Sequence, residues 1–219
     1  MVSPPKPRAH VYVDGFNLYY QRLRRTPFKW LNVEELARKL FHNLDVAVVK
    51  YFTARVKPSA FDPGIELRQD VYLTALRTCG RTEVIEGSYQ SHPKRLPLAK
   101  DFLAGRMNPV EVIVAEEKGS DVNLASHLLL DACQGKFDVA AVVTNDSDLT
   151  TPIEMVTRTL GKQVVLVSPL KPNSKRRPNR SLVNASTSQK SIRDGILRSS
   201  LLPDPVPHPR LRIAKPPRW

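Results

Sequence analysis

The sequence has few cysteines and no long apolar run. Its 219 residues include only Cys79 and Cys133, both in apolar helical patterns, with no CxxC pair and no His pair nearby. This pattern argues against metal binding through the thiols and favours reduced, buried cysteines in a cytoplasmic protein. No run approaches the length of a membrane span, and the N-terminal MVSPPKPR lacks the apolar core of a signal peptide. We therefore expect no membrane partner.

Acidic residues are scarce in the last quarter of the chain. From residue 169 onward there are twelve Lys and Arg but only Asp194 and Asp204, so this part carries +10 of the total net charge of +13. Such an excess predicts a polyanionic partner, although a solvated basic tail is the simpler alternative. From Pro203 onward six prolines and basic residues leave little to form a core. We expect residues 1–9 and 201–219 to be disordered and residues 10–200 to form one domain.

One buried strand followed by acids is the strongest local signal. Residues 139–143, VAAVV, are a short apolar run rich in β-branched residues, typical of a fully buried strand in a parallel sheet. The run ends in TNDSD, and the following TPIE (151–154) predicts a helix that begins there or slightly earlier. Asp146 and Asp148 therefore lie at the carboxyl end of a strand, where open α/β sheets bind ligands. The alternative is that they only cap the next helix.

The same arrangement occurs near the start of the chain. Residues 10–13, HVYV, predict a strand that ends at Asp14, and a helix follows from Leu18. Asn17 lies about one helical turn beyond Asp14. From there its side chain can reach back toward a phosphate or a metal-bound water.

A third acid begins a helix. A predicted strand at 110–115 leads to Ser120, a good N-cap residue, and to a helix at 122–134. Asp121 shares a helical stripe with the apolar Ala125 and Leu128, so it points inward. A buried carboxylate is costly unless it is paired, which favours a functional role over that of a plain first-turn acid.

The remaining pattern alternates helices and strands. Helices are expected at 33–44, 65–79, 152–160 and 181–200, and strands at 46–53, 83–89 and 163–167. Residues 90–109 are polar and interrupt the alternation, either as an excursion over the active edge or as a surface loop. The whole predicts a Rossmann-like three-layer α/β/α domain with a central, mostly parallel sheet.

Three segments in order resemble the NYN domain family, which has a PIN-like nuclease fold. They are VYVDGFNLYY (11–20), KGSDVNLA (118–125) and VTNDSDL (143–149), and GKQVVLV (161–167) is similar to the family's last strand. The resemblance covers roughly residues 10–200. Thr144-Asn145 stands where family members often have Ser-Gly.

The resemblance implies a metal-dependent endoribonuclease with an aspartate cluster that binds Mg²⁺ or Mn²⁺. Oxygen ligands without His or Cys suit such hard cations better than zinc. The implied ligands and catalytic residues are Asp14, Asp121, Asp146 and Asp148. Residues expected to contact RNA are Asn17, Lys118, Thr144, Asn145, Lys171, Lys175, Arg176 and Arg177.

Two other functions fit the pattern less well. A non-catalytic RNA-binding module would keep the fold with a weakened site. A haloacid-dehalogenase phosphatase would need a second Asp two residues after Asp14, where this chain has Phe16. The sequence leaves open which RNA is cut, whether DNA is also a substrate, and whether the protein is a monomer or a homodimer.

Overall fold

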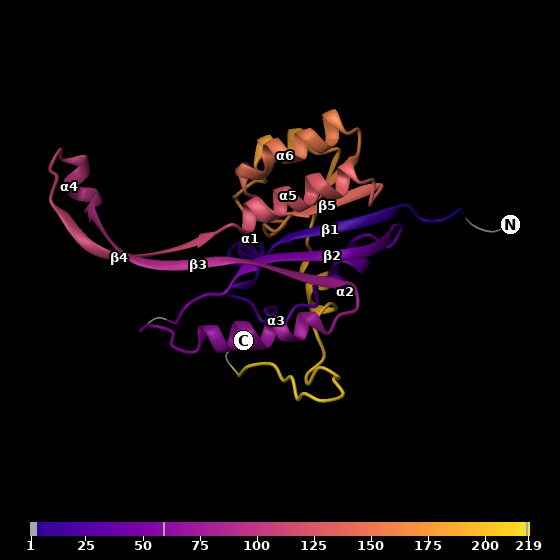
Figure 1. The fold of residues 1–219 in the computed structure, drawn as a ribbon, viewed down its shortest axis with the longest axis horizontal. Coiled ribbons are helices and arrows are strands. Elements are labelled where there is room, and N and C mark those ends of the chain that lie inside the picture. The colour runs from indigo at the N-terminus through magenta and orange to yellow at the C-terminus, as the bar shows by residue number, and fades with distance from the viewer. Residues whose placement is uncertain (1–3, 59, 218) are drawn as a thin grey trace.

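A single sheet forms the centre of the molecule. The computed structural model describes residues 4–58, 60–217 and 219, apart from the side chain of Ala115. The strands described are β1 (Arg8–Asp14), β2 (Asp45–Ala54), β3 (Thr82–Pro97), β4 (Pro109–Lys118), β5 (Val139–Val143), β6 (Gln163–Ser168) and β7 (Ser188–Ser191). Their order is β4-β3-β2-β1-β5-β6-β7, and every neighbouring pair is parallel except β3 and β4. The predicted Rossmann-like fold is confirmed (Figure 1).

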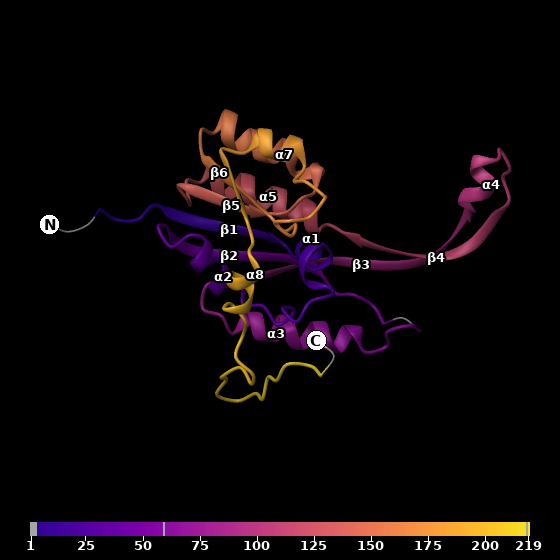
Figure 2. The same ribbon diagram turned by 180° about the vertical axis from the view of Figure 1, so that it is seen from behind.

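Helices cover both faces of this sheet. One face carries α1 (Gly15–Leu18), α2 (Val33–Leu40), α3 (Ile65–Arg77) and α8 (Asp194–Arg198); the other carries α5 (Ser120–Cys133), α6 (Thr150–Glu154) and α7 (Arg180–Ala185) (Figure 2). Short π-helical turns, η1 (Tyr19–Leu23) and η3 (Met155–Thr159), continue α1 and α6. Along β1, Val11 and Val13 pack into one core and Tyr12 into the other. Because both faces are covered, β5 is buried at every position, as its unbroken apolar run predicts.

The chain reverses its direction of winding at β1. The path from β1 to β2 runs through α2 on one face, and the path from β4 to β5 runs through α5 on the other. β2 and β5 therefore flank β1 on opposite sides. Such a switch point opens a crevice at the carboxyl ends of the strands, here between β1 and β5.

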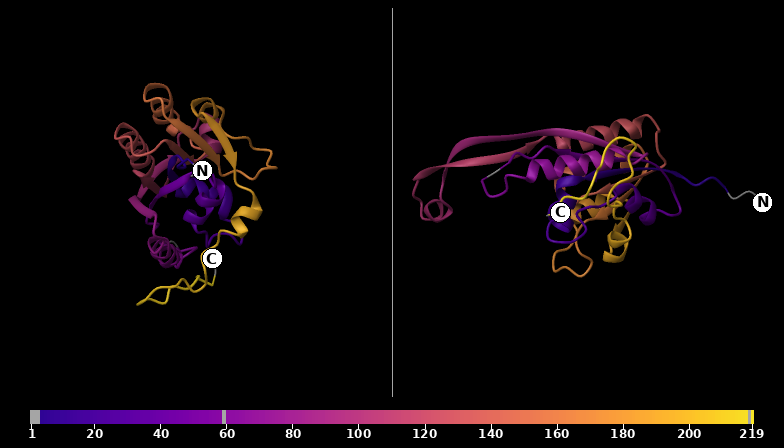
Figure 3. Two further views of the ribbon diagram at one scale, coloured as in Figure 1. Left: turned by 90° about the vertical axis from the view of Figure 1, so that its right-hand side faces the viewer. Right: turned by 90° about the horizontal axis from the view of Figure 1, so that it is seen from below.

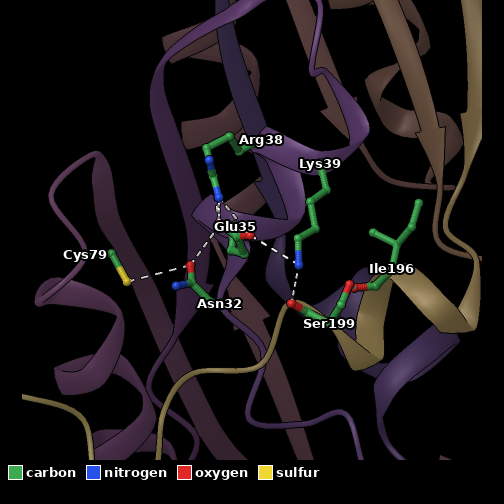
Figure 4. Close-up of polar contacts among 7 residues, drawn as sticks. All are labelled: Asn32, Glu35, Arg38, Lys39, Cys79, Ile196 and Ser199. Atoms are coloured by element: carbon green, nitrogen blue, oxygen red, sulfur yellow. Dashed lines mark hydrogen bonds and ion pairs between the residues drawn. The ribbon is translucent and has the colours of Figure 1, made fainter.

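Helix α2 shows how local polar contacts fix an element in this fold. The Asn32 side chain caps it by accepting a hydrogen bond from the Glu35 backbone N–H at 3.0 Å. Arg38 pairs with the Glu35 carboxylate one turn later, and Lys39 donates to the Ser199 carbonyl at the end of α8 (Figure 4). These contacts tie the C-terminal part of the domain to its first long helix.

The largest departure from expectation is residues 90–109, which are neither an excursion over the edge nor a loop. β3 pairs with β2 only as far as Gly87, and from Ser88 onward it pairs with β4 in an antiparallel arm. The arm projects far from the body and carries the short helix α4 (Ala99–Leu103) at its tip (Figure 3). The β3 half of the arm is exposed at every position from 90 to 96, so its sequence lacks the alternation that would predict a strand. The β4 half includes the strand predicted at 110–115.

Three smaller expectations are corrected. The single helix expected at 181–200 is α7, β7 and α8 in the structure, because β7 extends the sheet beside β6. Cys133 is exposed and Cys79 is half-buried, so neither thiol is fully buried as predicted. Ser120 is the first residue of α5 rather than its N-cap, which is Gly119.

The two predicted disordered ends have a defined path where the structure describes them. Near the N-terminus, the ammonium group of Lys6 donates a hydrogen bond to the His42 carbonyl at 2.7 Å. In the C-terminal segment Leu202, Val206 and Ile213 are buried in the core on the α3 side. Residues 1–3 and 218 lie outside the described residues. No helix in the described part of the chain is both long enough and apolar enough to span a bilayer.

A buried ion pair lies under α5, toward the amino ends of the strands. The Asp131 carboxylate is 1% exposed and accepts hydrogen bonds from Lys50 Nζ at 2.5 Å and the Tyr12 hydroxyl at 2.9 Å. Lys136 Nζ reaches its other oxygen at 3.2 Å. Burial alone would raise the pKa of Asp131, but the hydrogen bonds from these groups and the charge of Lys50 lower it to about 2.

Prediction: Asp131→Ala lowers the free energy of unfolding by about 3–5 kcal/mol, because it leaves the Lys50 ammonium buried without its partner. Urea titration measures the loss. Glu154→Ala, which breaks an exposed pair with Arg158, should change the stability by less than about 1 kcal/mol.

The depressed pKa of Asp131 adds a pH signature to the same comparison. Its stabilising contribution is present above about pH 4, the unfolded-state pKa, and is lost as pH falls toward 2. The stability advantage of the wild type over Asp131→Asn should therefore shrink in that interval. An advantage that stays constant from pH 5 to about pH 2 would contradict the assigned ion pair.

Candidate functional site

Asp14 is the most buried acid at the switch point. It is the last residue of β1 and the N-cap of α1, and its side chain is 5% exposed. One carboxylate oxygen accepts from the Asn17 backbone N–H at 2.9 Å, and the other accepts from the Thr144 hydroxyl at 2.9 Å. Asp14 is therefore held in one orientation from two elements.

The turn after β5 locks the two strand ends together. Thr144 Oγ1 also accepts from the Asp146 backbone N–H at 3.0 Å. The Asn145 backbone N–H donates to Asn17 Oδ1 at 3.0 Å, and its side-chain Oδ1 accepts from the Asn179 N–H at 2.8 Å. Thr144, Asn145 and Asn17 therefore make hydrogen bonds that hold the ends of β1 and β5 together. Thr144 and the Asn17 backbone orient the Asp14 carboxylate, and Thr144 also holds the backbone of Asp146.

Asp146 and Asp148 differ in their surroundings. Asp146 is half-buried and lines a pocket of about 240 Å³ together with Asp14. Its carboxylate also accepts from the Asp148 N–H at 3.1 Å, so it caps the turn η2 (Ser147–Leu149), as the simpler interpretation expected. Asp148 itself is exposed and is not among the residues that line this pocket.

Helix α5 brings two more acids to the same pocket. Asp121, in the first turn, is half-buried and faces the pocket, as its helical stripe predicts. Glu117 lies beside it and accepts from the Ser120 backbone N–H at 2.8 Å, so its carboxylate holds the start of the helix. Sequence reasoning missed Glu117, although its place just before the helix was a usable signal.

Negative charge accumulates in this pocket. Burial raises the pKa of Asp14 to about 7, and the charges of Asp121 and Asp146 add to the rise against the hydrogen bonds from Asn17 and Thr144. Burial also raises the pKa of Asp121 to about 6, with further repulsion from Asp146, Glu117 and Asp148. No Lys, Arg or His is among the described residues that line the pocket. A cation that entered would relieve this repulsion.

The donor set fits a hard divalent cation. All of its charged members are carboxylates, the ligands that Mg²⁺ and Mn²⁺ prefer. In the described part of the chain, however, no three His, Cys, Asp or Glu side chains are close enough to hold one ion together. Mg²⁺ commonly keeps several waters and takes one or two protein carboxylates, which this arrangement can provide.

The predicted basic residues gather next to the acidic pocket. Lys171, Lys175, Arg176 and Arg177 follow β6 and line a cavity of about 540 Å³ with Lys190. Arg176 also donates to the Gln21 side chain at 2.9 Å, and Gln21 lines the acidic pocket. The basic cavity and the acidic pocket are therefore joined at one side-chain contact.

Lys118 lies apart from these groups. It is exposed at the end of β4, and its ammonium pairs with Glu116 at 2.8 Å, so a phosphate would have to compete with that carboxylate. Two aromatic residues that sequence reasoning did not select, Phe16 and Tyr20, line the acidic pocket and stack with ring centroids 6.3 Å apart. They sit on α1 and η1, one turn apart, on the helix that follows Asp14.

A Rossmann-like fold with acidic side chains at the carboxyl edge of its central strands is typical of PIN-like proteins. The chain belongs to the NYN domain family, whose profile matches residues 8–190. Members of this family are usually nucleases, which makes a hydrolase the coarse functional class.

Two individual proteins are similar to this chain. The 6-hydroxy-3-succinoylpyridine 3-monooxygenase HspA of Pseudomonas putida is 31% identical to it, over 97% of this chain and 75% of that protein. A solved protein of unknown function from Vibrio parahaemolyticus matches with a TM-score of 0.55 at 18% identity, over 89% of this chain and 98% of that chain. The second likeness shows the fold alone.

Gly15 sets how closely α1 approaches the sheet. A Cβ at this position would lie 2.7 Å from the Phe52 carbonyl oxygen and 2.7 Å from the Tyr51 ring. No larger residue fits without moving the backbone that carries Asp14. The glycine thus places the acid against the end of β2 as well as β5.

Prediction: Gly15→Ala destabilises the fold by about 1–3 kcal/mol, the usual cost of overpacking a tight contact. Denaturant unfolding checks this. The matched control is Gly195→Ala, in α8, where a Cβ would meet nothing within 4 Å and should be neutral or slightly stabilising. Equal stabilities of the two variants would contradict the close approach at Gly15.

Proposed function

We propose that this protein is a metal-dependent endoribonuclease that hydrolyses RNA phosphodiester bonds with Mg²⁺ or Mn²⁺. One observation carries the proposal: acids from three separate elements, Asp14 on β1, Asp121 on α5 and Asp146 after β5, line one pocket at the switch point. Family membership supports the same class of reaction. Gathering buried carboxylates that repel one another costs stability, so the fold alone does not explain their placement in one pocket.

The acids have different parts in this proposal. Asp14 and Asp146 would hold the cation directly, and Asp121, Asp148 and Glu117 would act through bound water. When bound, such an ion supplies Lewis acidity for the phosphoryl oxygen and lowers the pKa of a bound water. Asn17 and Thr144 keep the Asp14 carboxylate directed into the pocket through their hydrogen bonds.

The basic cavity provides the means to hold the strand. Its five cationic side chains, with no carboxylate among the described lining residues, suit successive phosphates. The arm extends from the carboxyl end of β3, at the same edge of the sheet as the acidic pocket. It carries four further cationic residues that could contact phosphates: Lys94, Arg95, Lys100 and Arg106. Binding through these groups releases counterions, so it should weaken steeply as salt is raised.

Prediction: Asp146→Asn lowers the rate of Mn²⁺-dependent RNA cleavage by at least about 100-fold, because it removes a charge that stabilises the reacting centre. Cleavage of mixed RNA and DNA substrates by the wild type, Asp146→Asn and Asp14→Asn measures the effect. Asp70→Asn, which alters a carboxylate on α3 that pairs with Arg55 and does not line the acidic pocket, is the control and should keep full activity.

Two results would reject the nuclease. One is full activity of Asp146→Asn; the other is undiminished cleavage by the wild type in excess EDTA. The alternative function, a non-catalytic RNA-binding module, would show salt-sensitive RNA binding without any cleavage. Mn²⁺ should also raise the Tm of the wild type more than that of Asp146→Asn, since a ligand bound only by the native state stabilises it.

The relative from Pseudomonas putida carries a second candidate, oxygenation of a pyridine ring. The observation that favours it is an aromatic-lined cavity of about 320 Å³ that shares Phe16 and Tyr20 with the acidic pocket. This size suits a small aromatic substrate.

Prediction: if this chain is the nuclease proposed above, 6-hydroxy-3-succinoylpyridine incubated with the protein, a reduced nicotinamide or flavin donor and O₂ stays unchanged. Mass spectrometry of the products checks the result. Gain of one oxygen atom by the pyridine, absent in boiled protein, would favour the second candidate instead.

A further inference from the structure

A second cavity lies on the other side of Phe16 and Tyr20 from the acidic pocket. It has a volume of about 320 Å³ and is bounded by α1 and η1, the end of β2, the start of α3 and Trp219. Phe16 and Tyr20 line both spaces, so this aromatic pair is the wall between them. We call this second space the aromatic pocket.

Seven of its seventeen lining residues are aromatic. Tyr51 and Tyr72 meet edge to face with centroids 6.2 Å apart, and Tyr72 lies 5.4 Å from Trp219 at a tilt of 35°. On the opposite wall Tyr20 stacks on Phe16 at 6.3 Å and 14°. Ring faces and edges presented around one cavity favour a flat aromatic guest over an aliphatic one.

The lining of the pocket carries one more positive than negative charge. Its ionic lining residues are Lys29, Arg68 and Asp62, and Arg68 already pairs with Asp62 at 2.5 Å. Burial lowers the pKa of Lys29, and the positive charges of Arg68 and Lys215 lower it further against Asp62. An anionic group on the guest would reduce this repulsion between cations.

A polar donor also faces no partner. Trp219 lines the pocket, and its indole Nε1 is buried without a hydrogen-bond acceptor among the described residues. Gln69, by contrast, is occupied, because its amide accepts from Val56 N–H and donates to the Ala54 carbonyl, both at 2.9 Å. A guest that carried acceptor atoms would satisfy the indole.

We propose that the aromatic pocket binds a planar heteroaromatic ring that carries a negatively charged group. The ring lies among the tyrosines and Trp219, and the anion lies toward Lys29 and Arg68. A nucleotide of a polynucleotide strand and a free heteroaromatic carboxylic acid share this chemistry. The site is separate from the acidic pocket, so the inference does not depend on the nuclease activity.

Prediction: in EDTA, the full-length protein binds pyridine-3-carboxylate at least about tenfold more tightly than its neutral amide, as one charge-assisted contact implies. Isothermal titration calorimetry measures both affinities. The second pair of probes, uridine 5′-monophosphate and uridine, tests whether a nucleotide is the better guest. Tighter binding of either anion than of its neutral partner supports the proposal and identifies the source.

Variants locate the site. Lys29→Gln should remove the preference for the anion while leaving the affinity for the amide unchanged. Lys162→Gln, which lies just before β6 and outside the pocket lining, is the matched control and should behave as the wild type. In Trp219→Phe most of the ligand-induced change in tryptophan fluorescence should be lost, because the other tryptophan, Trp30, is not among the described residues that line the pocket and meets its lining through Tyr72, at 5.9 Å between ring centroids.

The proposal is overturned if charged and neutral probes bind equally or none binds at millimolar concentration. It is also overturned if Lys29→Gln and Lys162→Gln have the same effect. These results would leave the cleavage assays of Asp146→Asn untouched, so the two proposals fail separately.

Discussion

Burial of negative charge at one edge of the sheet is the constraint on which the site depends. Asp14 and Asp121 lose water without gaining a cationic partner in the pocket, and each has a raised pKa. Neutral donors, the Asn17 N–H and the Thr144 hydroxyl, hold Asp14 in place instead. Such donors orient a carboxylate without neutralising it. The edge therefore keeps an unmet demand for positive charge, which a bound cation can satisfy.

A contrasting solution occurs at the other end of the same strands. Under α5, Asp131 is as buried as Asp14 but is paired with Lys50 and bonded to Tyr12, and its pKa is lowered. The negative charge of Asp131 stabilises the folded protein, because Lys50 is its counterion. Two buried aspartates, Asp14 on β1 and Asp131 on α5, thus have pKa values shifted in opposite directions, and the presence or absence of a lysine partner decides between them.

The acidic pocket lies between two cavities of different character, one basic and one aromatic. On one side the basic cavity after β6 suits phosphates, and Arg176 links it to the pocket through Gln21. On the other, Phe16 and Tyr20 separate the acids from an aromatic pocket. A fold of this kind can host different chemistries by changing such neighbours. One protein similar to this chain is named a monooxygenase, whereas the family of this chain usually consists of nucleases.

The sequence by itself determined most of the strands and helices as far as β6, and it placed the acids at the ends of two strands and at the start of one helix. Residues 139–143 could be predicted as a strand because both faces of β5 are buried and its sequence is an unbroken apolar run. Asp14 and Asp146 could be placed from the ends of predicted strands, and Asp121 from its position on one helical stripe. The pairing of β3 and β4 as an arm could not be predicted, because residues 90–96 of β3 are exposed at every position and leave no periodic pattern, although the strand at 110–115 within β4 was predicted. Only the tertiary structure decided that Thr144 and Asn145 bond the carboxylate network, that Glu117 joins it, and that Trp219 closes an aromatic pocket. Those contacts join residues far apart along the chain, and local propensity carries no information about such distances.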